Sequence, residues 1–232
     1  MIKTAKENDG LSKGQEVAAL FDLDGVVFDT ESQYSIFWGM KGKMYHPEVE
    51  HFENVIKGQT LVQIFDRWFA GCGDVQRKIA DELEDFERGM AYDYVPGAED
   101  FLRDLRRAGI RTAVVTSSSE DKMQNVYRAH PEIKSYFDRI LTAEFFSRSK
   151  PEPDCYLLGA EVFGLPVTRC VVFEDSFNGL KAGRAAGMKV VGLSTTNAPD
   201  QIQALCDSVI PDFRDFYVEN LFEMLAWTDN ND

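Results

Sequence analysis

Cysteine and histidine are scarce in this sequence, and neither type is grouped. Among 232 residues there are four cysteines and three histidines. The cysteines form no Cys-x-x-Cys pair and the histidines share no metal-ligand spacing, so we expect neither a structural zinc site nor a disulfide framework. We interpret the cysteines as reduced, mostly buried thiols: Cys72, Cys155, Cys170 and Cys206.

Positive charge and long apolar runs are also lacking. The chain has 25 Lys and Arg against 39 Asp and Glu, a formal net charge of −14, which repels nucleic acid and anionic membranes, so we expect neither as a partner. No apolar run approaches the roughly 20 residues that span a bilayer, and the polar segment 1–16 lacks the apolar core of a signal peptide. We expect a cytoplasmic protein that is a monomer or a weak homodimer.

Apolar runs alternate with helical patterns over most of the chain, which indicates βαβ units and a parallel sheet. The hydrophobic content of 44% is enough for a sizeable core. The expected fold class is α/β, with a Rossmann-like parallel-sheet core. We expect strands at about 17–22, 111–116, 138–141, 169–173, 188–192 and 207–210, and helices at about 97–108, 120–129, 153–164, 176–186 and 213–226.

The segment 34–94 breaks this alternation, because it carries helix-like stretches without a convincing strand. We interpret it as an inserted α-helical cap domain, with residues 1–33 and 95–232 forming the core domain. Its two connections to the core fall near Asp29–Ser32 and Tyr94–Gly97. One hinge of two strands should therefore join the cap to the core.

Two carboxylates follow the first expected strand, in the sequence Asp22-Leu23-Asp24-Gly25. Alternation along a strand puts both aspartates on one side. Open α/β sheets bind ligands at the carboxyl ends of their strands, and Gly25 lets the chain turn away sharply. An Asp-x-Asp pair by itself is most often a surface turn, so the assignment of chemistry to this place depends on the rest of the chain.

Three further polar elements follow apolar runs or precede helices. Thr116, Ser117 and Ser118 come directly after the second expected strand, and the start of a helix with such donors can hold phosphate. Lys150 precedes Pro151, and the pair Glu174-Asp175 closes a later apolar run. The four elements together point to one site.

In this order and at this spacing, the four elements resemble the haloacid dehalogenase superfamily, specifically its phosphatase and β-phosphoglucomutase branch with a helical cap. The resemblance spans about residues 17 to 195 and rests on four segments: Asp22–Glu31, Val114–Ser118, Lys150–Asp154, and Phe173–Gly179 continuing to Met188.

The resemblance implies a role for each catalytic residue. Asp22 is implied as the nucleophile that forms an aspartyl-phosphate, and Asp24 as the acid that protonates the leaving oxygen and the base that later activates water. Thr116, with Ser117 and Ser118, would hold the transferring phosphoryl group, and Lys150 would bridge it to Asp22.

The resemblance also implies Mg²⁺ as the cofactor. A carboxylate can approach a phosphate ester only if cations and oriented donors neutralise the repulsion, and hard oxygen ligands suit Mg²⁺. The implied metal-binding residues are Asp22, Asp24, Asp175 and Glu174. For Glu174 two roles stay open: direct ligation, or a hydrogen bond that supports the ligands.

The expected function is that of a Mg²⁺-dependent phosphatase for a small phosphorylated metabolite of the sugar phosphate or phosphoglycolate class. By resemblance, Lys57 and Gln59 lie on a cap loop that faces the site and would contact substrate, although a solvated turn fits equally. The alternative is a β-phosphoglucomutase-like mutase, but Tyr34 and Leu61 stand where that enzyme carries a histidine and an arginine. Asp24 disfavours dehalogenation, and the complete residue set disfavours a catalytically silent binding protein.

Overall fold

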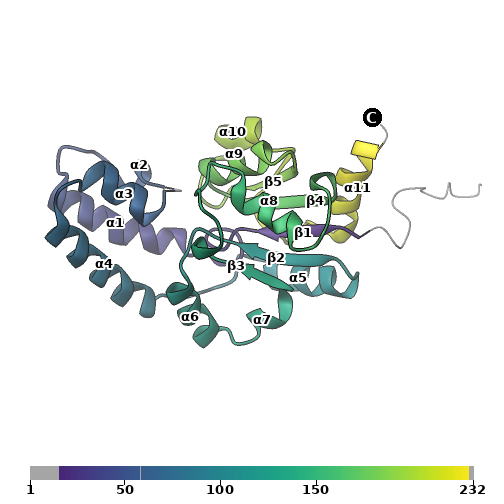
Figure 1. Ribbon diagram of the computed structural model, residues 1–232, viewed down its shortest axis with the longest axis horizontal. Helices are drawn as coiled ribbons and strands as arrows, with labels where there is room; N and C mark the ends of the chain where they lie inside the picture. Colours follow the sequence, from purple (N-terminus) through teal and green to yellow (C-terminus); the bar gives the residue numbers. More distant parts are fainter. Residues whose placement is uncertain (1–15, 58, 230–232) are drawn as a thin grey trace, which may run out of the picture.

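A six-stranded parallel sheet lies at the centre of the larger part of the molecule (Figure 1). The computed structural model describes residues 16–57 and 59–229; almost all of the polar segment 1–16, and Gly58 of the cap loop, lie outside the described residues. The strand order is β3-β2-β1-β4-β5-β6. The strands are β1 Ala18–Phe21, β2 Arg111–Val115, β3 Arg139–Leu141, β4 Cys170–Glu174, β5 Lys189–Leu193 and β6 Ser208–Ile210. All six expected strands and the expected fold class are confirmed.

The sheet is buried on both faces, as parallel sheets usually are. On one face Phe21 of β1 stacks on Phe173 of β4 with ring centroids 4.5 Å apart, and Phe101 packs edge-on against both rings. On the other face Leu20 and Val172 pack with Tyr156. Because β1 lies next to both β2 and β4, its carboxyl end sits where the chain order of the strands reverses, the usual ligand position in such sheets.

Helices cover both faces of the sheet (Figure 1). Those of the core are α5 Ala98–Arg107, α6 Glu120–Ala129, α7 Ile133–Tyr136, α8 Asp154–Glu161, α9 Phe177–Ala185, α10 Pro199–Ile202 and α11 Val218–Asp229, with 3₁₀ turns η1 Ala143–Phe145, η2 Val167–Arg169 and η3 Gln203–Leu205. The short helices α7 and α10 and the 3₁₀ turns were not predicted, because four residues are too few to show a helical period.

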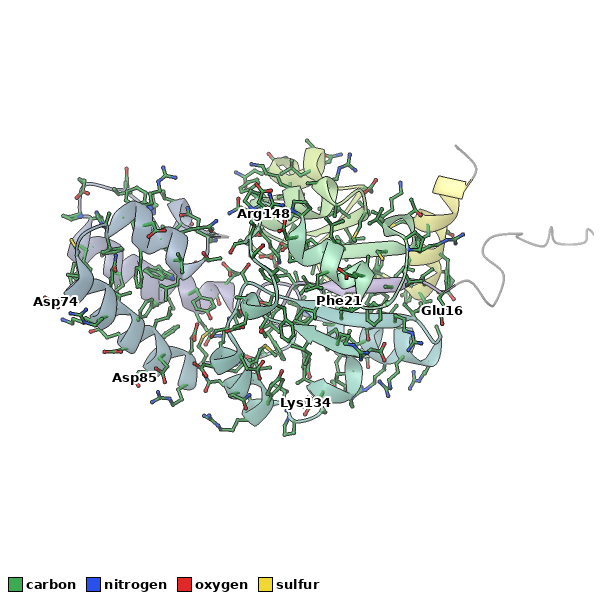
Figure 2. All side chains as sticks on the ribbon, viewed as in Figure 1. Glu16, Phe21, Asp74, Asp85, Lys134 and Arg148 are labelled. Atoms are coloured by element: carbon green, nitrogen blue, oxygen red, sulfur yellow. The ribbon has the colours of Figure 1, made fainter. Side chains whose placement is uncertain are left out.

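Four helices form a separate group to the left of the sheet in Figure 1. They are α1 Glu31–Tyr45, α2 Phe52–Val55, α3 Leu61–Trp68 and α4 Gly73–Arg88. This group has its own apolar cluster, in which Phe37, Phe52, Ile64 and Ile79 are buried. The exposed side of α4 carries charges that face away from the sheet, such as Asp74 and Asp85 (Figure 2).

The two connections between this helical group and the sheet pair with each other. The amide of Asp29 donates to the carbonyl of Asp93 at 2.8 Å, and the amide of Val95 donates to the carbonyl of Val27 at 2.9 Å. The carboxamide of Gln33 adds two bonds to the backbone of Ala91, at 2.7 and 3.0 Å. The connections therefore run antiparallel and side by side.

The cysteines differ in part from expectation. All four are free, but Cys72 is exposed and Cys206 only half-buried, so Cys155 and Cys170 alone are fully buried. Within the described ranges, no helix combines the length and the apolar character needed to cross a membrane.

Candidate active site

The turn after β1 fixes the two aspartates. The amide of Asp22 donates to the carbonyl of Phe173 at 3.0 Å, which extends the pairing of β1 with β4 by one residue. Leu23 is fully buried, so Asp22 and Asp24 lie on the opposite, site-facing side. Gly25 has a φ of 72°, and a Cβ there would lie 2.2 Å from an oxygen of Asp175, so this position requires glycine.

Lys150 lies at the centre of the site. Its Nζ donates to Asp22 Oδ1 at 2.8 Å, to Glu174 Oε1 at 2.6 Å and to the carbonyl of Val115 at 3.1 Å. Burial alone would lower the pKa of Lys150, but the charges of Asp22 and Glu174 outweigh it and raise that pKa well above its ordinary value. Lys150 is therefore a permanently charged cation, oriented by three acceptors.

Glu174 holds Lys150 and the backbone of the following turn. Its Oε1 accepts from Lys150 and from the Tyr156 hydroxyl at 3.1 Å. Its Oε2 accepts from the amides of Asp175 and Ser176, both at 2.9 Å, and from the Ser176 hydroxyl at 3.1 Å. Since both oxygens already carry several hydrogen bonds, this geometry favours the supporting role of Glu174 over direct metal ligation.

Asp175 has a buried oxygen that lacks a partner. Its Oδ2 accepts from the Thr196 hydroxyl, and the side chain of Asn197 donates to its backbone carbonyl at 2.9 Å. Its Oδ1 is buried and accepts no hydrogen bond from any described residue. A buried carboxylate oxygen without a donor is costly unless a cation lies beside it.

A divalent cation fits this group of carboxylates. Asp22, Glu174 and Asp175 each offer an oxygen, and these atoms lie within 4.8 Å of one another. Burial, with the charge of Glu174, raises the pKa of Asp175 well above its ordinary value. Oxygen-only ligands and a shortage of positive charge match the preferences of Mg²⁺.

The group formed by Asp22, Glu174 and Asp175, here called the carboxylate cluster, makes the stability of the metal-free protein depend on pH. Burial raises the pKa of Asp22 from 3.8 to about 7, against the opposing charge of Lys150. A raised pKa means that the folded state binds this proton more tightly than the unfolded state does. The resulting contribution to folding stability is complete below about pH 4 and is lost as the pH rises through about 7. We expect the melting temperature in EDTA to fall between about pH 6 and about pH 8.5, and Asp22→Asn to flatten that fall. A melting temperature that rises over this interval would contradict the assignment.

The side chain of Asp24 does not belong to the carboxylate cluster of Asp22, Glu174 and Asp175. Its Oδ1 accepts from the Thr30 hydroxyl at 2.6 Å, and its Oδ2 accepts from the Ser118 hydroxyl at 3.0 Å and from Lys122 Nζ. Burial opposes ionisation, but the charge of Lys122 and these hydrogen bonds outweigh it and lower the pKa of Asp24. The carboxylate of Asp24, expected among the metal-binding residues, thus lies outside the carboxylate cluster in this structure.

Lys122 is a site residue that sequence reasoning missed. Its side chain is 4% exposed, and its Nζ lies 4.6 Å from the centre of the Tyr34 ring. The hydroxyl of Tyr34 in turn donates to Glu87 of α4 at 2.7 Å. A cation in the first turn of a helix is electrostatically unfavourable, and this anomaly in α6 is the signal that could have identified Lys122.

The loop after β2 places the remaining predicted core residues. Thr116 is buried, and its hydroxyl oxygen accepts from the amide of Ser118 at 3.0 Å, which leaves the hydroxyl proton available to a ligand. The Ser118 hydroxyl donates to Asp24 Oδ2, whereas the neighbouring Ser117 is half-buried.

The two predicted cap residues differ. Lys57 Nζ donates to the carbonyl of Thr196 at 3.5 Å, next to the hydroxyl that contacts Asp175, so Lys57 reaches the edge of the site. Gln59 is half-buried and instead donates a solvent-exposed hydrogen bond to the carbonyl of Val55, the last residue of α2, at 2.9 Å. The structure does not bring the Gln59 side chain to the aspartates.

Comparison with known proteins gives the family. A family model for haloacid dehalogenase-like hydrolases matches residues 17–187. The chain is 35% identical to hexitol phosphatase A of Escherichia coli over 187 residues, covering 78% of this chain and 82% of that protein. It is 32% identical to the fructose-1-phosphate phosphatase YqaB of the same organism, covering 74% of this chain and 93% of that protein.

A solved structure has the same fold. The β-phosphoglucomutase of Clostridium difficile superposes with a TM-score of 0.76 at 22% identity, covering 93% of this chain and 100% of that one. The protein therefore belongs to the haloacid dehalogenase-like hydrolases. The resemblance stated from the four sequence elements, and the class of phosphoric monoester hydrolase that it implied, are confirmed.

Proposed function

We propose that the protein is a Mg²⁺-dependent phosphatase that hydrolyses a small sugar phosphate or related monophosphate through an aspartyl-phosphate. The observation that carries this proposal is the placement of Lys150 between Asp22 and Glu174, whose carboxylates lie within 4.8 Å of that of Asp175; among the described residues, none donates a hydrogen bond to Asp175 Oδ1. A nucleophile, a fixed cation and a place for a metal together meet the needs of phosphoryl transfer. The names of the two bacterial relatives support the sugar phosphate class.

Asp22 is the proposed nucleophile. Lys150 holds its Oδ1, and no described residue donates a hydrogen bond to its Oδ2, so Oδ2 is the oxygen free to attack phosphorus. The bond from phosphorus to the leaving oxygen breaks as the bond to Oδ2 forms. Asp22 and Asp175 would hold Mg²⁺, which when bound neutralises charge on the phosphoryl oxygens.

Asp24 is the proposed acid and base. In the first step it gives a proton to the leaving oxygen, and in the second it takes a proton from the water that hydrolyses the aspartyl-phosphate. In this structure Asp24 is held ionised by Lys122, Thr30 and Ser118. It must therefore leave Lys122 and gain a proton before the first step.

Residues 34–94 are the proposed cap domain, with core residues on either side at 1–33 and 95–232. The helix α1 begins at Glu31, close to that boundary. Lys57 and Gln63 both reach core backbone at 3.5 Å, at Thr196 and Lys150. Closing the cap over the aspartates would exclude water and strengthen the electrostatic interactions there.

A panel of phosphorylated metabolites tests the proposal and separates hydrolysis from mutase chemistry. Tyr34 contacts Glu87 and Lys122, and Leu61 is the first residue of α3. Because both side chains are uncharged, neither supplies a cation for a second phosphate. We expect β-glucose 1-phosphate, given Mg²⁺ and catalytic β-glucose 1,6-bisphosphate, to release phosphate or stay unchanged. Isomerisation to glucose 6-phosphate that exceeds phosphate release about a hundredfold, a preference of about 2.7 kcal/mol, would establish the mutase.

A further inference from the structure

All three N–H groups of the Lys150 ammonium are engaged in this structure. A lysine ammonium donates three hydrogen bonds, and those of Lys150 go to Asp22 Oδ1, Glu174 Oε1 and the carbonyl of Val115. In the proposed reaction, however, a cation beside Asp22 has to neutralise the charge on the phosphoryl oxygens. One of the three acceptors must therefore release Lys150 when a phosphate ester is bound.

Glu174 is the acceptor that can release Lys150 and still keep a donor on each oxygen. Its Oε1 also accepts from the hydroxyl of Tyr156 at 3.1 Å, and its Oε2 accepts from two amides and the Ser176 hydroxyl. A buried carboxylate oxygen that loses its only donor is costly. Because Tyr156 stays on Oε1, Lys150 can turn one N–H from Glu174 to a phosphoryl oxygen without leaving Oε1 unpaired.

Tyr156 contacts Lys150 as well as Glu174. It lies on α8, and its side chain is fully buried among core residues that include Leu20 and Val172. The Nζ of Lys150 lies 5.1 Å from the centre of the Tyr156 ring, within the range of a cation–π interaction. The ring therefore attracts the ammonium group, while the hydroxyl of the same side chain binds the carboxylate that the ammonium group has to leave.

We propose that Tyr156 is a positioning residue for phosphoryl transfer: its hydroxyl keeps Glu174 Oε1 paired while Lys150 turns one N–H to the phosphoryl group, and its ring holds the ammonium beside Asp22. This inference rests on the proposed phosphatase function and deepens it. Lys150 is bound to the carboxylate that attacks phosphorus, so a phosphoryl oxygen comes closest to it as the new bond forms. Loss of the Tyr156 hydroxyl should therefore affect kcat more than KM.

A second buried tyrosine provides the matched control for a purely structural role. The hydroxyl of Tyr136 donates to Glu99 at 2.7 Å, Arg103 lies 5.8 Å from the centre of its ring, and Arg103 pairs with Glu99 at 2.6 Å. This trio has the same composition as the one at the site, namely a tyrosine, a glutamate and a cation. Tyr136 precedes β3, however, at the end of the sheet opposite the aspartates.

We expect Tyr156→Phe to lower kcat at least tenfold for both a hexitol 6-phosphate and p-nitrophenyl phosphate, each with Mg²⁺, and to change KM less than threefold. Tyr136→Phe should keep the wild-type kcat, although both variants should lower the melting temperature, because each loses one buried hydrogen bond. A smaller loss of kcat in Tyr156→Phe, a loss that appears in KM instead, or an equal loss in Tyr136→Phe would overturn the proposal.

A binding measurement keeps this test separate from the proposed function. Orthovanadate can adopt the five-coordinate geometry of a transferring phosphoryl group, whereas inorganic phosphate cannot. In calorimetry with Mg²⁺, Tyr156→Phe should bind vanadate at least tenfold more weakly than the wild type and phosphate within threefold. An unchanged vanadate affinity, or an equal loss for both anions, would refute the role of Tyr156. If wild-type protein releases no phosphate from either substrate, the phosphatase proposal fails, while the vanadate comparison still decides the role of Tyr156.

Discussion

Asp22→Asn is expected to reduce phosphate release at least a thousandfold, about 4 kcal/mol in the activation barrier. The amide cannot form the aspartyl-phosphate, although its oxygen can still accept the hydrogen bond that Lys150 now gives to Oδ1. The substitution also removes a carboxylate whose burial is unfavourable. The variant should therefore fold at least as stably as the wild type in EDTA.

The measurement is turnover of an aryl phosphate with Mg²⁺, together with a thermal unfolding curve. Asp29→Asn makes the same chemical change seven residues further on, at an exposed position, and should retain wild-type turnover. If Asp22→Asn kept turnover within about tenfold of the wild type, a barrier change of only ~1.4 kcal/mol, Asp22 could not be the nucleophile.

Chelation is expected to remove activity completely, and Mg²⁺ to restore it. The buried Oδ1 of Asp175 lacks a donor among the described residues, and Asp22 offers a further oxygen within 4.8 Å of the Asp175 carboxylate. Calcium should support turnover poorly, because its larger and looser coordination shell misplaces the phosphoryl group. Mg²⁺ should also raise the melting temperature of the wild-type protein.

Asp175→Asn provides the matched variant for the metal. It should raise the Mg²⁺ concentration needed for half-maximal activity at least tenfold, equivalent to about 1.4 kcal/mol of binding free energy, and should reduce the Mg²⁺-dependent rise in melting temperature. Full activity after exhaustive chelation would exclude the metal and favour dehalogenase-like chemistry.

Most of the sheet could be predicted from sequence because its strands are short apolar runs closed by polar residues. The runs ending at Phe21, Val115 and Phe173 stand out from the helical patterns around them, and each is a strand. The polar residues after these runs, including Asp22, Thr116 and Asp175, meet because the carboxyl ends of parallel strands lie at one edge. The predictable part of the site therefore follows from strand position.

The part that could not be predicted depends on side chains that approach from other elements. Lys122 reaches Asp24 across 98 positions of sequence, and Thr196 reaches Asp175 from the loop after β5. Both residue types are common on surfaces. The place of Lys122 in the first turn of α6 is an anomaly that the sequence shows, but only the three-dimensional contacts connect Lys122 and Thr196 to the aspartates. Gln59 shows the converse, since its loop was predicted but the direction of its side chain depends on a local bond to Val55.

The three bonds of Lys150 make the site depend on assembly of three neighbouring strands, β2, β1 and β4. Its ammonium group joins the turn after β1, the carbonyl of Val115 at the end of β2 and Glu174 at the end of β4, partners that lie 128, 35 and 24 residues away in the sequence. Contacts that span such distances form only when the intervening chain has been arranged. A nascent, nicked or misfolded chain with one strand out of place thus has no oriented cation beside Asp22. If the proposed mechanism holds, such a chain would not hydrolyse phosphate esters, and activity would be gained and lost together with the native fold.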